Sequence, residues 1–342
     1  MKTTFKEVSF VFAALTPRRV WNYVKVASSL YLSRMLKRPI VWGLPVQLLY
    51  EPTNYCNLRC PQCPTGTREL ARPEGMVRDT EAYRKTVDDL AKDSILVQLY
   101  FQGESYLSPS FFEMVEYASS KNLLTEISTN AHFLTDENCR RTIETGLSKM
   151  IISIDGTTQD VYEKYRVRGR LSKVLDGTKR LVEWRKKLGR KNPYIVFQLI
   201  AFSHNEHQIK DVRKLAKELG VDAVSIKTAQ IYNPEDGNEL MPQNKELSRY
   251  ELGEDGHYHI KSKLANHCWF LWQTASVTWD NRVVPCCFDK HAKFQMGDTS
   301  TQSFRDIWRS KAYTNFRQAI LRGRKNIDMC RNCTEGLKVL EA

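Results

Sequence analysis

The sequence has no apolar run long enough to cross a membrane as a helix. No stretch of its 342 residues approaches the roughly 18 consecutive apolar positions that indicate a spanning segment. Internal repeats and low-complexity tracts are also absent. We therefore predict neither a membrane-spanning helix nor a repeat architecture.

Acidic residues are the scarcer charge, because 39 Asp and Glu stand against 52 Lys and Arg, which gives a formal charge of +13. This excess favours anionic partners: nucleic acid, phospholipid, a phosphorylated or carboxylated substrate, or an acidic electron donor. No base-stacking module is visible, so nucleic acid is the weakest of these partners. A hydrophobic share of 42% indicates a globular protein with one large domain, or with one large and one smaller domain.

Cysteine is too sparse for a disulfide scaffold, since nine cysteines are spread over the whole chain and most fall in two groups, a distribution that favours metal binding. In the first group, Cys56, Cys60 and Cys63 have Cys-x3-Cys-x2-Cys spacing. A loop this short can turn three thiolates toward one point, and a [4Fe–4S] cluster held by three ligands keeps one iron open. The alternative is a zinc knot or a redox Cys-x2-Cys pair, but zinc needs a fourth ligand and the next group begins only at Cys268.

This motif resembles the signature of the radical S-adenosylmethionine (SAM) enzymes. In that family the open iron chelates SAM, and an electron from the cluster cleaves SAM to methionine and a 5′-deoxyadenosyl radical that abstracts a substrate hydrogen. The resemblance implies that Cys56, Cys60 and Cys63 hold the catalytic cluster. Because an open cluster needs a reducing compartment with little oxygen, we expect a cytoplasmic protein.

An alternation of strands and helices follows the first cysteines and predicts an α/β fold. Short apolar runs predict strands at 46–51, 95–101, 123–128, 149–155, 194–201 and 222–228, with amphipathic helices between them. Six such units imply a parallel sheet with right-handed crossovers, too small for an eight-fold barrel. The resemblance implies the same partial (β/α)6 TIM-like barrel, with SAM at the carboxyl edge of the strands.

Gly103 and Glu104 come directly after the second predicted strand, within Gln102-Gly-Glu-Ser105. This stretch resembles the family's Gly-Gly-Glu-Pro motif, whose backbone and acid hold the SAM amino group, and it departs from that motif at Gln102 and Ser105. A glycine lets a backbone approach a ligand closely. The alternative is an ordinary turn after a strand.

Further polar candidates stand at the next two strand ends. Ser128 and Asn130 end the third strand, and Ser153 ends the fourth. In relatives, an arginine placed like Arg166 pairs with the SAM carboxylate, which a guanidinium can grip with two hydrogen bonds. Arg168 is the competing choice, and any of these polar residues could instead serve only the local structure.

The second cysteine group comprises Cys268, Cys286, Cys330 and Cys333, separated by 17, 43 and 2 residues. Four thiolates fill every ligand position of a cubane cluster. The set resembles the SPASM/Twitch auxiliary-cluster domain and so implies a second [4Fe–4S] cluster. Cys287 is an alternative to Cys286 as a ligand, and structural zinc is the alternative to the cluster.

The chain is expected to divide into four parts: residues 1–40 as a basic amphipathic segment, 41–230 as the partial barrel, 231–265 as a connector, and 266–342 as a small cysteine-rich auxiliary-cluster domain. In the last part we predict a hairpin of 273–279 and 282–285. A helix capped by Ser303 should follow, with its apolar side formed by Phe304, Ile307, Trp308, Ala312 and Phe316.

Residues 1–40 carry an apolar stripe of Val20, Val24, Ala27 and Tyr31 among basic residues. The pattern predicts a helix that either lies on an anionic membrane, at its inner face, or packs on the body of the enzyme with a solvated basic side.

Together these patterns predict a radical SAM oxidoreductase, similar to a dehydrogenase, in which the auxiliary cluster accepts the second electron of a substrate oxidation. One alternative is a SPASM peptide maturase that forms a thioether or carbon–carbon crosslink, although no separate leader-binding domain is expected. Another is a non-catalytic iron–sulfur or zinc docking protein. We expect a small-molecule or peptide substrate and an acidic electron donor, a flavodoxin or ferredoxin.

Overall fold

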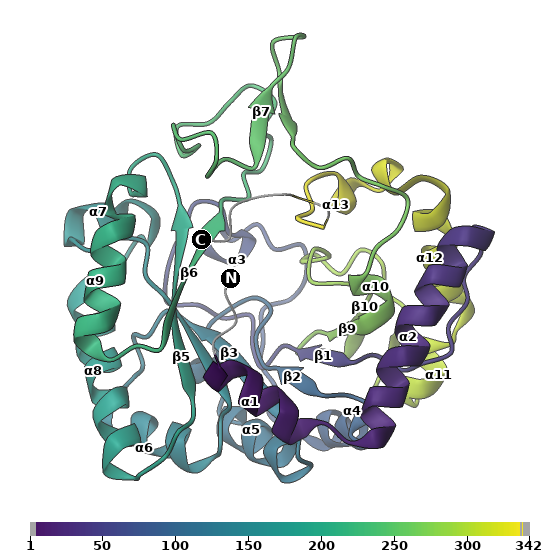
Figure 1. The fold of residues 1–342 in the computed structure, drawn as a ribbon, viewed down its shortest axis with the longest axis horizontal. Helices are drawn as coiled ribbons and strands as arrows, with labels where there is room; N and C mark the ends of the chain where they lie inside the picture. Colours follow the sequence, from purple (N-terminus) through teal and green to yellow (C-terminus); the bar gives the residue numbers. More distant parts are fainter. Residues whose placement is uncertain (1–4, 336, 338–342) are drawn as a thin grey trace.

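One curved sheet of nine strands organises the protein (Figure 1). The computed structural model describes residues 5–335 and residue 337. Six parallel strands lie in chain order: β1 (Gln47–Tyr50), β2 (Leu96–Gln98), β3 (Leu124–Thr129), β4 (Lys149–Ser153), β5 (Tyr194–Ala201) and β6 (Ala223–Thr228). The predicted partial (β/α)6 barrel is confirmed, because each predicted strand is present within a few residues of its expected bounds and the sheet stays open.

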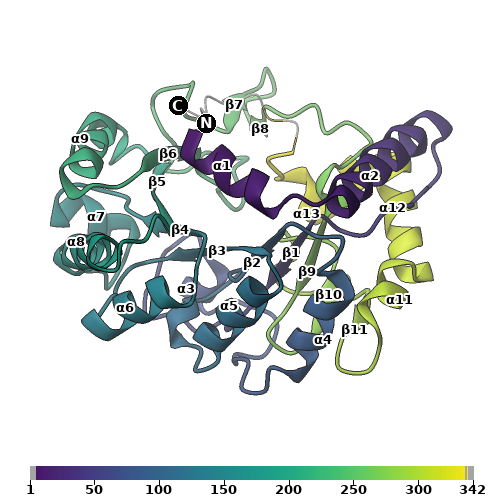
Figure 2. The same ribbon diagram turned by 60° about the horizontal axis from the view of Figure 1, so that its bottom comes forward.

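Helices cover the outer face of this sheet (Figure 2). They are α4 (Glu81–Leu90), α5 (Phe111–Ser120), α6 (Asp136–Glu144), α7 (Gln159–Tyr165), α8 (Leu171–Lys187) and α9 (Ile209–Leu219). Each buries one apolar side, as Tyr83, Val87 and Leu90 do on α4. Strands buried on both faces need such cover, and this explains their nearly continuous apolar sequences.

The carboxyl-terminal strands extend the same sheet beyond β1. β9 (Thr274–Val277) pairs in parallel with β1, and β10 (Arg282–Val284) returns antiparallel to β9, followed by the short β11 (Gly297–Asp298). Asn281 turns the predicted hairpin with φ 66°, a left-handed conformation that asparagine tolerates. Cys286, in the second cysteine group, therefore follows an extension of the barrel sheet, while Cys330 lies on α13 (Asp328–Arg331).

Two details differ from the sequence-based expectation. Residues 231–265 contain a hairpin of β7 (Tyr250–Leu252) and β8 (Tyr258–Ile260), which projects from the body (Figure 1). The helix after Ser303 is interrupted and forms α11 (Phe304–Trp308) and α12 (Lys311–Gly323). Because Ser310 caps α12 by accepting from the Tyr313 amide, the helical phase restarts there, so Ala312 is exposed and Tyr313 is buried.

Shorter helices complete the chain: α3 (Pro64–Thr67), α10 (Phe270–Gln273) and α13 (Asp328–Arg331), with single 3₁₀ turns η1 (Ser105–Leu107), η2 (Glu206–Gln208) and η3 (Arg324–Asn326).

The amino-terminal segment forms two helices, α1 (Phe5–Ala14) and α2 (Pro17–Leu36). α2 packs on the body through Asn22, Val26 and Leu30, while Val20 and Tyr31 of the apolar stripe point to solvent. The helix therefore packs through the face opposite to its apolar stripe, whereas an amphipathic helix ordinarily buries that stripe. Among the described residues, no helix is both long and apolar enough to cross a membrane.

A buried arginine fixes α2. The Arg19 guanidinium donates to the main-chain oxygens of Ala14, Asn122, Ala91 and Lys121 at 2.6, 2.6, 2.8 and 3.2 Å. Ala91 and Lys121 are the C-caps of α4 and α5, whose last carbonyls lack helical partners and carry partial negative charge. Arg19 thus satisfies two helix ends and joins α2 to the barrel.

Replacing Arg19 with Met should lower the free energy of unfolding by about 3 kcal/mol, because several carbonyls lose their buried donor. Urea unfolding under anaerobic conditions measures this loss. The neighbouring Arg18→Met change is the control, because the Arg18 side chain is 55% exposed and Asp93 keeps Arg305 as a second partner, so a much smaller loss is expected. Equal losses in the two variants would contradict the anchoring role of Arg19.

Candidate active site

The first cysteine group lies in the loop that leaves β1. Cys60 is buried, and Cys56 and Cys63 are partly buried. The loop closes tightly, because a Cβ on Gly66 would lie 2.5 Å from the Cys60 carbonyl oxygen. Only glycine fits that position, so the sequence after Cys63 helps to hold the three thiols near one another.

A cavity of about 270 Å³ opens beside these thiols, at the carboxyl ends of β1 to β5. All nine residues predicted for this site line it: Cys56, Cys60, Cys63, Gly103, Glu104, Ser128, Asn130, Ser153 and Arg166. Two of the polar residues reach the sulfurs, with Asn130 Nδ2 at 3.8 Å from Cys56 Sγ and an Arg166 nitrogen at 3.8 Å from Cys60 Sγ. The structure therefore brings the predicted set together around one space.

Glu104 connects the loop after β2 to the end of β3. Its carboxylate accepts from Asn130 N at 2.7 Å and from Thr129 Oγ1 at 2.8 Å. Burial raises the pKa of Glu104 to about 7, although these hydrogen bonds oppose the shift. Gly103 precedes it with φ +78°, and a Cβ there would lie 2.5 Å from the Thr53 carbonyl. The loop can approach the cysteine segment this closely only with glycine.

Arg166 is held by a buried acid at the end of β4. Its Nε donates to Asp155 Oδ2 at 2.5 Å, and Asp155 Oδ1 accepts from Ile200 N at 2.7 Å. Burial disfavours the charged guanidinium, but Asp155 and the Cys60 thiol outweigh that effect and raise the pKa of Arg166 well above its usual value. Arg166 is thus a fixed cation beside Cys60, while Arg168, the competing choice, does not line the cavity.

Behind the cavity lies a fully buried ion pair between Glu51 and Arg72. Glu51 accepts two hydrogen bonds from Arg72 at 2.5 and 2.6 Å, and further bonds from Gln102 N and Trp279 N, each at 3.1 Å. Arg72 also donates to the Lys290 carbonyl at 2.8 Å. This pair ties β1 to the segment after the cysteines, to the loop after β2 and to the second cysteine region.

Several residues of the cavity wall were not predicted. Tyr100 and Phe101 follow β2, while Gln230 and Lys290 come from distant parts of the chain. Proximity to the strand end could have indicated the first two. No local pattern could have indicated Lys290, because only the pairing of β9 with β1 brings its region to this cavity.

The second cysteine group surrounds a separate small cavity. Its lining includes Cys268, Cys286, Cys287, Cys330 and Cys333. Burial raises the pKa of Cys286 well above its ordinary value, and the neighbouring thiols Cys287, Cys268 and Cys333 add to the shift. Lys290 acts on Cys287 in the opposite direction, although burial still raises the pKa of that thiol to about 11.

The donor sets at both cavities fit iron–sulfur clusters. Three thiols with an adjoining polar cavity suit a cluster with one open iron, and the second set supplies the four thiolates that close a cubane. Beside the first set, Arg166 offers a guanidinium to a carboxylate and Glu104 offers a carboxylate to an ammonium group. These are the two charged groups at the amino acid end of SAM.

Comparisons with known proteins identify two domains in the chain. Residues 50–216 match the model of the radical SAM superfamily, and residues 268–334 match the SPASM iron–sulfur cluster-binding domain. The chain is therefore a radical SAM protein. Within that superfamily it belongs with the members that carry a SPASM domain, a combination that implies SAM and two [4Fe–4S] clusters.

Several curated relatives match most of the chain, among them a cofactor-modifying protein and a peptide cyclase. The tungsten-containing aldehyde ferredoxin oxidoreductase cofactor-modifying protein of Pyrococcus furiosus is 28% identical over 79% of this chain and 82% of its own length. The PqqA peptide cyclase of Bradyrhizobium diazoefficiens is 25% identical over 81% and 76%. Among solved structures, SuiB of Streptococcus suis bound to SAM gives a TM-score of 0.64 at 12% identity, covering 87% of this chain and 72% of that one, and so supports the fold.

The Asp155→Asn change should weaken SAM binding by about tenfold, because Arg166 would lose the charged hydrogen bond that orients it. Equilibrium dialysis with anaerobically prepared protein measures the dissociation constant. Asp222→Asn is a matched control, since it disrupts another largely buried ion pair, with Arg185, that does not line the cavity. Unchanged SAM affinity in the Asp155 variant would reject the positioning role.

Iron content distinguishes Cys286 from Cys287 as the cluster ligand. The parent should hold about eight irons per chain, the Cys286→Ser variant about four, and the Cys287→Ser variant about eight. Iron analysis after anaerobic reconstitution gives these values. The opposite result, with iron lost only from the Cys287 variant, would move the ligand to Cys287.

Replacing Arg72 with Met should lower the free energy of unfolding by about 3 kcal/mol or more, because Glu51 would remain as a buried carboxylate without its cation. The double variant Glu51→Gln/Arg72→Met should lose less than the sum of the two single changes. Arg84→Met is the control, because its pair with Glu113 is exposed and exposed pairs contribute little to stability. Urea unfolding that finds the Glu51 and Arg72 losses additive would argue against their coupling.

Proposed function

We propose that this radical SAM enzyme modifies a peptide, which it binds in a vestibule beside the SAM cavity. The main support is the vestibule itself, a cavity of about 790 Å³ that shares the lining residues Gln230 and Lys290 with the SAM cavity. This volume lies in the upper part of the range for ligand sites, which is roughly 300 to 1,000 Å³. A chain segment could enter from it and present one residue to the reacting centre.

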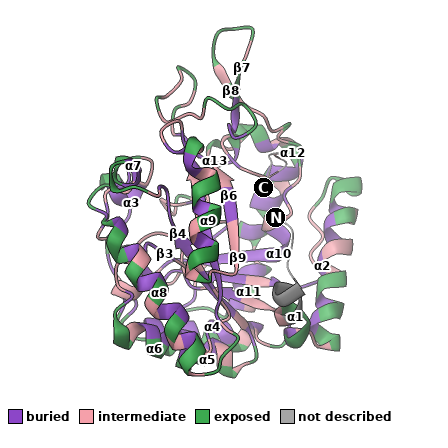
Figure 3. Ribbon diagram, turned by 60° about the vertical axis from the view of Figure 1, so that its left-hand side comes forward, coloured by how far each residue is buried: buried purple, intermediate pink, exposed green. Residues whose placement is uncertain are grey.

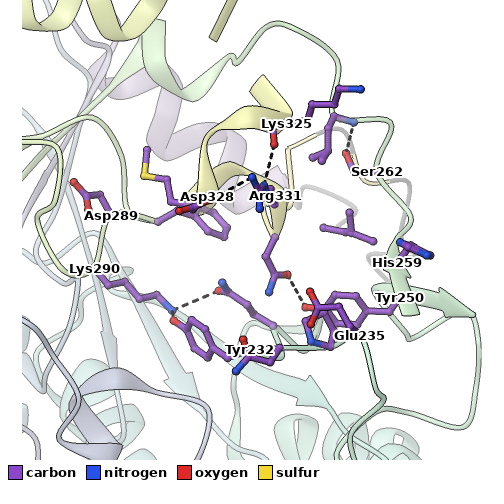
Figure 4. Close-up of a pocket in the computed structure, with 18 of the residues that line it drawn as sticks. Tyr232, Glu235, Tyr250, His259, Ser262, Asp289, Lys290, Lys325, Asp328 and Arg331 are labelled. Carbon is purple, nitrogen blue, oxygen red and sulfur yellow. Dashed lines mark hydrogen bonds and ion pairs between the residues drawn. The ribbon is translucent and has the colours of Figure 1, made fainter. Parts of the chain in front are cut away.

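Three regions that are distant in sequence form the vestibule (Figure 4). The connector contributes Tyr232 and the β7–β8 hairpin. The loop after Cys287 contributes Lys290, and α13 contributes Arg331. Backbone and side-chain groups of this mixed polarity suit an extended peptide, which needs main-chain hydrogen bonds along its length and pockets for its side chains.

Lys290 stands at the junction of the two cavities. Its Nζ donates to Tyr232 Oη at 2.7 Å and to Gln230 Oε1 at 3.4 Å, and Figure 4 shows it beside Tyr232. Its main chain is fixed by Arg72. A cation held in this way can pair with a carboxylate or a peptide carbonyl of the substrate and so orient the segment that faces the SAM cavity.

When bound, SAM and the cluster at the first cysteine group would supply the radical chemistry, and the protein would supply orientation and a confined site. Arg166 and Glu104 would bind the carboxylate and the amino group of SAM. The aromatic residues Tyr100, Tyr165 and Phe202 would restrict water at the reacting position.

The relatives favour a peptide over a small molecule as the substrate, because one of the curated matches named above is a peptide cyclase. The substrate oxidation that we predict from the sequence, with the auxiliary cluster as electron acceptor, is the second candidate. Five cysteines line one cavity and can supply four cluster ligands, which favours this candidate, since a fully ligated cluster can accept an electron without binding substrate.

Deuterium transfer to 5′-deoxyadenosine tests the substrate class. Reduced enzyme and SAM are incubated with perdeuterated extract of cells that produce the protein, separated into peptide and small-molecule fractions. We expect the peptide fraction to transfer deuterium to 5′-deoxyadenosine, as measured by mass spectrometry. Peptidase digestion of that fraction should abolish the transfer. Label that comes from the small-molecule fraction and survives digestion would contradict the peptide assignment.

The Lys290→Met change should leave substrate-independent SAM cleavage within about twofold and lower substrate-dependent deuterium transfer at least tenfold, since a charged hydrogen bond contributes about 1.5 to 3 kcal/mol. Lys293→Met is the control, because Lys293 lines only the vestibule. If both variants lose transfer equally, Lys290 has no special role at the junction.

A further inference from the structure

Large apolar side chains on the protein surface gather on one segment. Those at the end of α1, along α2 and just beyond it are exposed: Val11, Phe12, Val20, Trp21, Tyr23, Val24, Tyr31, Met35, Leu36 and Trp42. In the rest of the described chain only Tyr55, Val167 and Leu252 are comparably exposed. Contiguous apolar surface on a soluble protein commonly marks an interaction site.

The exposed residues form a continuous ridge along α2. Val20, Val24, Tyr31 and Met35 recur at intervals of four, seven and four residues, which places them on one side of a helix with 3.6 residues per turn. Tyr31 is 63% exposed, Met35 61% and the neighbouring Trp21 59%. Figure 3 shows the outer side of α2 as exposed.

The opposite side of α2 fixes this orientation. It buries polar groups that have specific partners, with Asn22 donating to the Leu44 and Asp93 carbonyls at 2.9 and 3.0 Å. Arg19 binds the helix ends described above, and Ser33 Oγ accepts from Ile40 N, beyond the end of the helix, at 2.8 Å. Rotating α2 to bury its apolar ridge would break these hydrogen bonds, so the ridge remains directed outward.

Basic residues flank the ridge on both sides. On the helical projection, Lys25 and Arg34 lie about a quarter turn from its centre in opposite directions, and Lys37 and Arg38 follow at its end. Lys25 Nζ lies 5.8 Å from the centre of the Trp21 ring. No acidic residue occurs between Val8 and Tyr50, so this surface carries only positive charge.

We propose that α2 and the end of α1 dock the protein on an anionic lipid bilayer, with α2 lying in the plane of the interface. An apolar ridge with aromatic residues and basic flanks is the arrangement that enters the boundary between head groups and acyl chains. The ridge would enter that boundary, and Lys25, Arg34, Lys37 and Arg38 would contact the anionic head groups.

Two other occupants fit the surface less well. A second copy would bring two sets of positive charges together, which opposes association. An acidic flavodoxin or ferredoxin would match the positive charge. Its carboxylates would, however, lie against the apolar ridge, where they would lose water without gaining hydrogen-bond partners.

Vesicle cosedimentation of the anaerobically prepared holoprotein tests the proposal. The vesicles are phosphatidylcholine alone, or phosphatidylcholine with one quarter phosphatidylglycerol. We expect binding only to the anionic vesicles, weakened about 30-fold or more by Arg34→Glu/Arg38→Glu and at least tenfold by Tyr31→Ser/Met35→Ser. The matched controls are Arg213→Glu/Lys217→Glu on exposed positions of α9 and Leu252→Ser, whose side chain is 60% exposed; these should bind like the parent.

Three results would overturn the proposal. One is the absence of binding to anionic vesicles, and another is equal weakening by the control variants. The third is a parent protein that does not bind vesicles, combined with a defect confined to the α2 variants. Lost self-association in those variants would assign the surface to a second copy, and slower reduction by flavodoxin would assign it to the electron donor. Circular dichroism and iron content of each variant verify that it remains folded and loaded.

Discussion

The buried ion pair of Glu51 and Arg72 holds together the segments that form the active site. Both side chains are completely removed from solvent, a condition that is costly unless each charge is fully paired and hydrogen-bonded. Here that condition is met, because Glu51 also accepts main-chain amides at Gln102 and Trp279 and Arg72 donates to Lys290. The requirement to satisfy two buried charges therefore fixes four segments relative to one another.

This arrangement has a consequence for the two cysteine groups. The strand that leads to the first group, β1, is paired with β9, which leads to the second, and the ion pair joins the loops that leave both strands. The two cavities lined by thiols are consequently joined through one sheet, and Lys290, from the loop after Cys287, lines the first cavity.

The amino-terminal helix illustrates a different constraint. Its apolar periodicity identifies an amphipathic helix, and burial of the apolar side is the ordinary outcome. α2 departs from that outcome because the groove that receives it contains main-chain carbonyls at and near the ends of α4 and α5, which lack helical partners. Arg19 and Asn22 provide donors there, and Val26 and Leu30 on the same side join the hydrophobic core. Hydrogen bonds and apolar contacts together therefore decide which side of α2 faces the protein.

The sequence by itself determined the elements whose signals are local. Cysteine spacing, apolar strands and strand-end polar residues, read with the resemblance to radical SAM enzymes, predicted the partial barrel and a set of nine residues that line one cavity. Only the tertiary structure decided the pairing of β9 with β1, the place of Lys290, the restart of the helix at Ser310 and the orientation of α2. Each of these features depends on contacts between residues that are distant in sequence. Local sequence patterns do not predict such contacts, because they are determined by the packing of the whole fold.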